Sequence, residues 1–341
     1  MPNSDDDTSM PVLVTGATGY VASWLIKQLL AEGFTVHAAV REPTNTDKLK
    51  YLNQLAEASP GSLHYFKANL LAKGSYAEAM TGCQVVFHTA SPFTLNVNDP
   101  QKDLIEPAQL GTRNILEQAN QTTTVKRVVV TSSCAAIYGD VADLEQAKGE
   151  AFTEADWNTS SSLSHQPYAY SKTLAEQEAW KIAKNQDRWD LVVINPSLVV
   201  GPGINPFATS ASFGLIKQFG DGTMKSRMVD LALGAVDVRD VAAAHIAAGF
   251  TPSAKGRYIT SGHNTSFPKF ARFLREGKAS GGEKRFGETY PLPTKILPKW
   301  LVWIVGPFLA ENTTRKFIAR NIGFPFRADS SKGMRELGLT Y

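Results

Sequence analysis

Short apolar runs divide the first two hundred residues into segments with the length and composition of buried β-strands. Each run is bounded by glycine, proline or polar residues, as strands in a compact sheet are. The predicted strands are Val12–Thr15, Thr35–Val40, Leu63–Phe66, Gln84–His88, Arg127–Thr131 and Leu191–Ile194.

The segments between these runs place apolar residues at helical spacing. The predicted helices are Val21–Leu30, Asp47–Ala56, Ser75–Met80, Leu104–Ala119 and Tyr168–Ala183. Strands that alternate with helices favour a parallel sheet covered on both faces, so the pattern predicts an α/β fold of the Rossmann type, doubly wound. A ligand is then expected outside the carboxyl ends of the strands.

The alternation fades after residue 200, where Gly201–Pro206 has the composition of a loop. We predict a Rossmann domain over residues 11–200. A smaller, irregular α/β lobe over 201–341 carries substrate specificity, and some of its segments return to the sheet core. The elements predicted in this lobe are the helices Phe207–Phe219, Val238–Ala248 and Phe267–Arg275 and the strand Arg257–Thr260.

Composition describes an ordinary globular chain of 341 residues, 43% hydrophobic and 20% charged. A net charge of +3 is too small to argue for nucleic acid, and Cys83 and Cys134 fit neither a disulfide framework nor a metal site. These features favour the cytoplasm and no bound metal, and we expect a monomer or homodimer. Residues 1–10 are polar and acidic, and we expect them to form a disordered tail. The apolar run Ile296–Ala310 is too short to span a membrane and predicts a core or lid helix, with a helix at a membrane surface as the alternative.

A glycine turn follows the first strand. Gly16 permits a tight turn, and Gly19 lets backbone N–H groups approach a pyrophosphate at the start of the next helix. The residues expected at this phosphate cradle are Gly16, Thr18, Gly19, Tyr20 and Val21. Taken alone, the pattern is equally compatible with a turn that binds nothing.

The end of the second strand bears on the choice of cofactor. An acidic residue there, roughly 20 residues past the glycine turn, would hold the ribose 2′-hydroxyl of NAD. This chain has Arg41, with Lys48 further on, and a basic residue suits the 2′-phosphate of NADPH. Glu42 follows directly and weakens the preference, and an exposed arginine at a strand end is also common without a ligand.

Tyr168 is the only one of ten tyrosines with a lysine four residues later, Lys172. On a helix this spacing places both side chains on one face, and the fifth strand ends nearby in Ser132 and Ser133. A tyrosine can donate a proton to a forming alkoxide, and a neighbouring ammonium lowers the phenol pKa from its ordinary value near 10. A serine hydroxyl can polarise the carbonyl. Together they predict carbonyl reduction by hydride transfer.

At these residues the chain resembles the extended short-chain dehydrogenases/reductases, and within them the dihydroflavonol-4-reductase and cinnamoyl-CoA reductase group. The segments that carry the resemblance are Thr15–Leu25, Val40–Asn45, Val86–Pro92, Val130–Ser133, Tyr168–Trp180 and Pro196–Pro202. The resemblance implies Ser133, rather than Ser132, as the catalytic serine beside Tyr168 and Lys172. It implies an NADPH site at Arg41, Lys48, Asn69, Leu70, Thr89, Ala90, Ser91, Lys172, Pro196 and Val199, and Thr131 and Tyr168 are expected beside the nicotinamide.

Three departures qualify this resemblance. Ala22 replaces the third glycine of the extended pattern, and Asn69 stands where an aspartate is usual near the adenine. The signature NWYCYGK of cinnamoyl-CoA reductases is absent, which disfavours a CoA thioester. Position alone suggests an apolar pocket for an aryl or medium alkyl carbonyl compound, formed by Phe93, Ile137, Phe207 and Met228.

Two other functions remain open from the sequence. A nucleotide-sugar epimerase or dehydratase uses the same scaffold, but it would need polar groups for a diphosphate, and Arg41 disfavours it. A redox sensor that binds NADP without turnover would have no use for the Tyr168 and Lys172 pair. His88, at the end of the fourth strand, is expected to be a packed core histidine rather than a base.

Overall fold

A parallel sheet of seven strands forms the centre of the computed structural model, which describes residues 10–92, 97–147, 149–206, 210–225, 227–278, 283–309 and 313–341. The strand order is β3-β2-β1-β4-β5-β6-β9, and every neighbouring pair is parallel. These strands are β1 (Val12–Thr15), β2 (Thr35–Val40), β3 (Ser62–Lys67), β4 (Val85–His88), β5 (Arg127–Thr131), β6 (Asp190–Pro196) and β9 (Gly256–Thr260).

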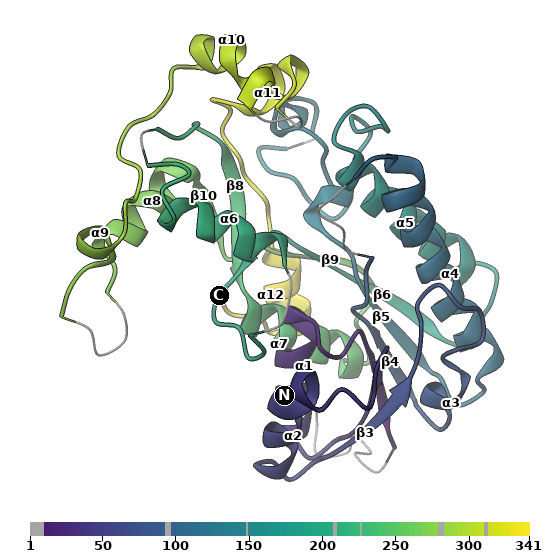
Figure 1. Cartoon of the computed structure of the whole chain (residues 1–341). Coiled ribbons are helices and arrows are strands. Elements are labelled where there is room, and N and C mark those ends of the chain that lie inside the picture. The colour runs from purple at the N-terminus through teal and green to yellow at the C-terminus, as the bar shows by residue number, and fades with distance from the viewer. Residues whose placement is uncertain are drawn as a thin grey trace.

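Helices cover both faces of this sheet (Figure 1). One face carries α1 (Tyr20–Ala31), α2 (Thr46–Glu57), α7 (Val238–Phe250) and α12 (Ser331–Leu337). The other carries α3 (Ala77–Met80), α4 (Glu106–Gln121) and α5 (Pro167–Ala183). A π-helical turn, Gln101–Ile105, leads into α4. The predicted doubly wound Rossmann-type fold is confirmed.

Strand periodicity explains the two covered faces. Val12 and Val14 of β1 pack with the core under α1 and α7, whereas Leu13 between them packs with the core under α3, α4 and α5. All three side chains are at most 2% exposed. Because both faces of the strand are buried, its sequence is continuously apolar rather than alternating. Burial of this kind stabilises the fold by roughly 25 cal/mol per Å² of apolar surface.

A second, smaller sheet belongs to the C-terminal lobe. In it β8 (Ala232–Asp237) lies between β7 (Leu198–Val200), to which it is parallel, and β10 (His263–Ser266), to which it is antiparallel. Figure 1 shows α6 and α8 beside this sheet and α10 and α11 at the top of the molecule, away from the Rossmann sheet. The helices are α6 (Ala211–Gly220), α8 (Phe267–Glu276), α9 (Phe286–Thr289), α10 (Lys299–Leu309) and α11 (Arg315–Asn321).

The two parts of the molecule are interleaved along the chain. The strand β9 and the helices α7 and α12 lie beyond residue 200 but complete the Rossmann layers, while β7 lies before residue 201 and belongs to the small sheet. The division at residue 200 therefore remains a prediction about function rather than a boundary of structure. Of the predicted tail, residues 1–9 lie outside the described residues.

The apolar run Ile296–Ala310 forms α10 over Lys299–Leu309. Its interpretation as a core helix is wrong, since Trp300 is 66% exposed and Phe308 is 84% exposed. Among the described residues one side of the helix is covered, by Ile318 of α11 and by Ile322 just after that helix, which pack with Val302. Apolar composition alone could not distinguish a buried helix from one that presents its apolar side to solvent.

Candidate active site

The glycine turn has the backbone geometry that the sequence predicts. Gly16 has a φ of +65°, and a Cβ there would lie 3.0 Å from Ala90 Cα. The N–H of Gly19 donates to Gly16 O at 2.8 Å, and Gly19 is the N-cap of α1. No side chain caps this helix, and no acidic residue lies in its first turn. Its first N–H groups are therefore available to an anion, which fits the phosphates of a dinucleotide.

Asn205 connects this turn to α2. Its amide Nδ2 donates to Thr18 O at 3.5 Å and to Lys48 O at 3.4 Å. The sequence predicts a loop over Gly201–Pro206. It gave no indication that Asn205 in this loop contacts two segments expected to bind the cofactor, the glycine turn and the start of α2. Asn205 is only 2% exposed, so it is part of the wall of the cradle.

Arg41 and Lys48 lie at the carboxyl end of β2 and in the first turn of α2. Lys48 Nζ lies 3.5 Å from Glu42 Oε2, so Glu42 pairs with Lys48 rather than with Arg41. Arg41 is exposed and makes no ion pair among the residues that the structure describes. Its guanidinium is thus available to bind a phosphate, which supports its predicted role in binding the 2′-phosphate of NADPH.

The carboxyl end of β4 packs directly against the glycine turn. Thr15 Oγ1 accepts a hydrogen bond from Ala90 N at 3.0 Å and lies 3.0 Å from His88 Nδ1. Thr89 Oγ1 donates to Thr15 O at 2.5 Å. Burial lowers the pKa of His88 to about 3, with the nearby charge of Lys172 acting in the same direction. His88 is therefore neutral and structural, as expected.

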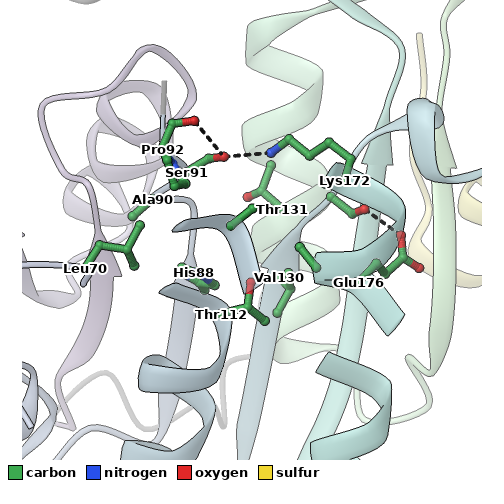
Figure 2. A pocket seen from close by; sticks show the side chains of 13 residues that line it. Leu70, His88, Ala90, Ser91, Pro92, Thr112, Val130, Thr131, Lys172 and Glu176 are labelled. Carbon is green, nitrogen blue, oxygen red and sulfur yellow. Dashed lines mark hydrogen bonds between the residues drawn. The ribbon is translucent and has the colours of Figure 1, made fainter. Parts of the chain in front are cut away.

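Lys172 points across the ends of the central strands toward Ser91, as Figure 2 shows. Its Nζ donates to Ser91 Oγ at 2.9 Å. The ammonium lies 5.9 Å from the centre of the Tyr168 ring, and Tyr168 itself is 52% exposed. The structure thus brings Ser91, Tyr168 and Lys172 together at one edge of the sheet, on the side where the glycine turn lies.

The pKa of Tyr168 differs from the expectation that the Lys172 ammonium lowers it. Desolvation raises the pKa of Tyr168 above its ordinary value, and burial lowers the pKa of Lys172 to about 8. The expected lowering of the Tyr168 pKa by Lys172 is therefore outweighed by desolvation. The phenol is protonated at neutral pH, which is the form that can donate a proton to an alkoxide.

The two neighbouring serines have different environments. Ser132 is 7% exposed, and its hydroxyl donates to Glu176 Oε2 at 2.5 Å. Ser133 is half-buried, and its Oγ accepts from Ala135 N at 3.1 Å at the start of the 3₁₀ turn Cys134–Ala136. The hydroxyl proton of Ser133 remains available, which supports it rather than Ser132 as the serine that polarises a carbonyl.

A buried ion pair fixes this edge of the sheet to α5. Glu176 Oε1 accepts from Arg257 Nε of β9 at 2.6 Å, and neither side chain is more than 6% exposed. Glu176 Oε2 also accepts from Asn195 Nδ2 at 2.7 Å, and the same amide donates to Ser133 O at 3.1 Å. Sequence reasoning missed these residues, although Glu176 lies one helical turn beyond Lys172 and two beyond Tyr168, on the same face.

A second polar cluster fixes the start of α5. Gln166, just before Pro167, has a φ of 54°, which is uncommon for any residue but glycine. Asp140, which is fully buried, accepts from Gln166 Nε2 at 2.8 Å and from His165 Nε2 at 2.9 Å. The same carboxylate accepts from Asn321 Nδ2 and Arg320 Nε of α11, each at 2.6 Å.

The remaining predicted cofactor residues lie along the same edge. Asn69 follows β3, where its Oδ1 accepts from Leu71 N at 3.1 Å, and Leu70 lines the pocket that also contains Lys172. Thr131 Oγ1 lies 2.6 Å from His245 Nε2 at the end of β5. Pro196 ends β6, and Val199 lies in β7. These positions are compatible with the predicted site.

Two of the four residues predicted to line the substrate pocket are buried in the core. Ile137 is 1% exposed in a core cluster with Phe152 and Phe326, and Met228 is 4% exposed beside Phe219. Neither presents surface to a substrate, because each side chain fills the interior of its own core cluster. Phe93 and Phe207 lie outside the described residues.

Among the described residues no group of three or more histidine, cysteine or acidic side chains is placed to hold a metal ion. No helix in that part of the chain is long and apolar enough to cross a bilayer.

A Rossmann sheet with an uncapped glycine turn, and a Tyr/Lys pair on the helix after its fifth strand, define the class of dinucleotide-dependent short-chain dehydrogenases/reductases. The chain belongs to the NAD dependent epimerase/dehydratase family, whose model matches residues 12–259. Membership confirms the predicted resemblance to the extended members of the class.

Three known proteins illustrate the similarity. "Cinnamoyl-CoA reductase CAD2" of Medicago truncatula is 40% identical over 78% of this chain and 80% of its own length. "Bifunctional dihydroflavonol 4-reductase/flavanone 4-reductase" of Pyrus communis is 35% identical over 84% and 80%. The crystal structure of Gre2 from Candida albicans, in complex with NADPH, has a TM-score of 0.73 and 28% identity over 97% of this chain and 94% of that one.

Proposed function

We propose that this chain is an NADPH-dependent reductase that converts aldehydes or ketones to alcohols, with Ser133, Tyr168 and Lys172 as the catalytic residues. The observation that carries the proposal is the placement of Tyr168 and Lys172 beside Ser91 at the strand ends, with the serine strand end held against α5. The named relatives and the NADPH-bound structure agree with this activity.

The residues present fit the cofactor. The amides at the start of α1 are uncapped, Gly16 permits the tight turn with a φ of +65° and close packing against Ala90, and Arg41 is free of ion pairs among the described residues. We therefore assign the phosphates to the glycine turn and the 2′-phosphate to Arg41. Lys172 would hold the ribose hydroxyls in place of its present partner Ser91.

Each catalytic residue has one task in the reduction. When bound, NADPH supplies the hydride that the carbonyl carbon accepts. Ser133 donates a hydrogen bond to the carbonyl oxygen as negative charge builds there, and Tyr168 transfers its phenolic proton to that oxygen. The Lys172 ammonium stabilises the phenolate that remains. The reverse sequence oxidises the alcohol.

We further propose that residues 11–200 bind the cofactor and that 201–341 mainly select the substrate. The charge balance of +3 and the two buried free thiols support a cytoplasmic enzyme, monomeric or homodimeric, that does not act on nucleic acid. The epimerase or dehydratase alternative shares the family model, but free Arg41 and the reductase relatives favour reduction.

A substrate screen tests the proposal. NADPH oxidation, measured by absorbance, is followed against aldehydes, ketones, flavonoids and acyl-CoA thioesters. The last class is included because a named relative is a cinnamoyl-CoA reductase, although the signature of that group is absent here. We expect turnover with at least one aldehyde or ketone and loss of it in Tyr168→Phe. No oxidation with any carbonyl, together with turnover of a nucleotide sugar, would overturn the assignment.

A further inference from the structure

The helix α10 presents a wide apolar surface to solvent. Trp300, Trp303, Ile304 and Phe308 are 66%, 43%, 50% and 84% exposed. Their spacing of three, four and eight positions places them on one side of the helix. We call these four residues the α10 face. The opposite side is anchored, because Val302 packs against Ile318 of α11 and against Ile322 just after it. The face is therefore held outward by a buried contact behind it.

The stretch of sequence that contains the α10 face is basic. Residues 290–320 contain one acidic residue, Glu311, and five basic ones. Arg320 alone of these five is ion-paired among the described residues, with Asp140 and Asp143. The other four are exposed: Lys295, Lys299, Arg315 and Lys316.

Two of these cations lie directly against aromatic rings of this region. The guanidinium of Arg315 is 4.7 Å from the centre of the Trp303 ring, so a positive charge borders the α10 face itself. Lys299 Nζ is 4.5 Å from the centre of the Phe324 ring and donates to Ala319 O at 3.1 Å. The charge of Arg315 thus borders the apolar α10 face, and Lys299 lies on the side of the helix that contacts α11. An apolar face with cations near it suits an interface between water, anionic headgroups and acyl chains.

The charge pattern argues against a second copy of this chain as the occupant. A two-fold dimer through the α10 face would bring the guanidinium of Arg315, which borders that face, from both copies into one interface, and like charges across an interface oppose association. A protein partner would also be expected to form hydrogen bonds at a density of about one per 100–200 Å². Ile304 and Phe308 offer none, and each tryptophan offers only its indole N–H.

We propose that α10 is a peripheral membrane-docking helix that inserts its apolar face into the headgroup region of bilayers containing anionic lipid. With 11 residues and Pro307 inside it, the helix is too short to span, so it would lie in the plane of the surface. The four unpaired cations would contact lipid phosphates and carboxylates. Docking through α10 leaves the Rossmann sheet on the far side of the molecule (Figure 1).

Vesicle flotation tests the proposal with the full chain. We expect the wild type to float with vesicles of phosphatidylcholine containing about a third phosphatidylserine, and to bind vesicles of pure phosphatidylcholine at least about tenfold more weakly. Each cation near the surface contributes roughly a fivefold increase in partitioning, and the cations act together. Binding should fall as salt rises, and tryptophan emission should shift to shorter wavelength on binding.

Two variants and one control separate the contributions. Phe308→Asp removes the most exposed apolar side chain and should reduce partitioning by about tenfold or more. Lys316→Gln should reduce it by roughly fivefold. The control is Phe273→Asp on α8, where Phe273 is 60% exposed and lies 5.7 Å from the guanidinium of Arg272. It should bind vesicles like the wild type.

Several outcomes would overturn the proposal. A wild type that stays unbound, or that binds both kinds of vesicle equally, removes the anionic membrane as the occupant. A concentration-dependent dimer in sedimentation that Phe308→Asp converts to a monomer would assign the face to a second copy. Loss of turnover in Phe308→Asp without vesicles, with an unchanged melting temperature, would assign α10 to the substrate cleft instead.

Discussion

Arg320 Nε lies 2.6 Å from Asp140 Oδ2, a contact between residues 180 positions apart that joins the C-terminal lobe to the start of the helix carrying Tyr168. Burial alone would raise the pKa of Asp140, but hydrogen bonds from Asn321, His165 and Arg320 outweigh it and keep the pKa below its ordinary value. Because Gln166 also donates to this carboxylate, the unusual backbone before α5 depends on it.

We predict that Asp140→Asn lowers both stability and turnover. The substitution removes the buried charge that accepts from Gln166, Arg320 and Asn321, at a cost on the order of 3 kcal/mol, and Arg320 keeps only its second partner, Asp143. The melting temperature should fall by several degrees, and kcat should fall more than the affinity for NADPH, because the start of α5 moves while the glycine turn does not. Calorimetry and fluorescence titration with NADPH measure the two effects.

Glu150→Gln is the matched control for Asp140→Asn. Its ion pair with Arg327, at 3.0 Å, has both side chains exposed and should contribute little to stability.

The lowered pKa of Asp140 also determines how the stability of the fold depends on pH. The carboxylate stabilises the fold above its unfolded pKa near 4, and this contribution is lost as pH falls through the lower folded value. Equal acid sensitivity of wild type and Asp140→Asn would contradict this role.

Tyr168→Phe should leave NADPH binding nearly intact and reduce turnover by at least about 10²-fold, the scale of a lost general acid. Steady-state kinetics and a fluorescence titration give the two quantities. Tyr170→Phe is the control, since it makes the same change two residues along the same helix. If Tyr168→Phe retained wild-type turnover, the proton donor would have to be sought elsewhere.

The pH dependence of kcat/KM for NADPH should reflect the titration of the Lys172 ammonium. Its pKa of about 8 means that the ammonium is present below pH 8 and is lost as pH rises through that value. Because kcat/KM for NADPH reflects groups of the free enzyme, it should be level near neutrality and fall above about pH 8. In Lys172→Arg the fall should move to higher pH, since arginine keeps its charge. A profile unchanged by the substitution would mean that another group titrates.

The sequence was sufficient to predict the sheet because local patterns determine it. The strands β1, β2 and β5 begin and end where the apolar runs do. The pair Tyr168 and Lys172 was found for the same reason, since helical spacing alone places both side chains on one face of α5.

Contacts between distant positions could not be predicted in this way. Glu176 and Arg257 are 81 positions apart, and each reads in the sequence as an ordinary charged residue. Only the fold shows that both are buried and that they fix the serine strand end. Two of the four substrate candidates, Ile137 and Met228, are contradicted for a related reason, because they were chosen by position and are buried in the core. Apolarity cannot distinguish a pocket wall from a core.

Arg41→Ala tests the choice of cofactor. Only NADPH carries the 2′-phosphate, so KM for NADPH should rise far more than KM for NADH. A charge-assisted hydrogen bond of this kind contributes on the order of 1.5–3 kcal/mol, or roughly 10- to 150-fold. Lys48→Ala should have a smaller effect, because Lys48 is paired with Glu42 at 3.5 Å. Lys50→Ala, an exposed cation further along α2, is the control and should change neither constant. If Arg41→Ala weakened both cofactors equally, Arg41 would be structural and the assignment of NADPH would lose its main support in this chain.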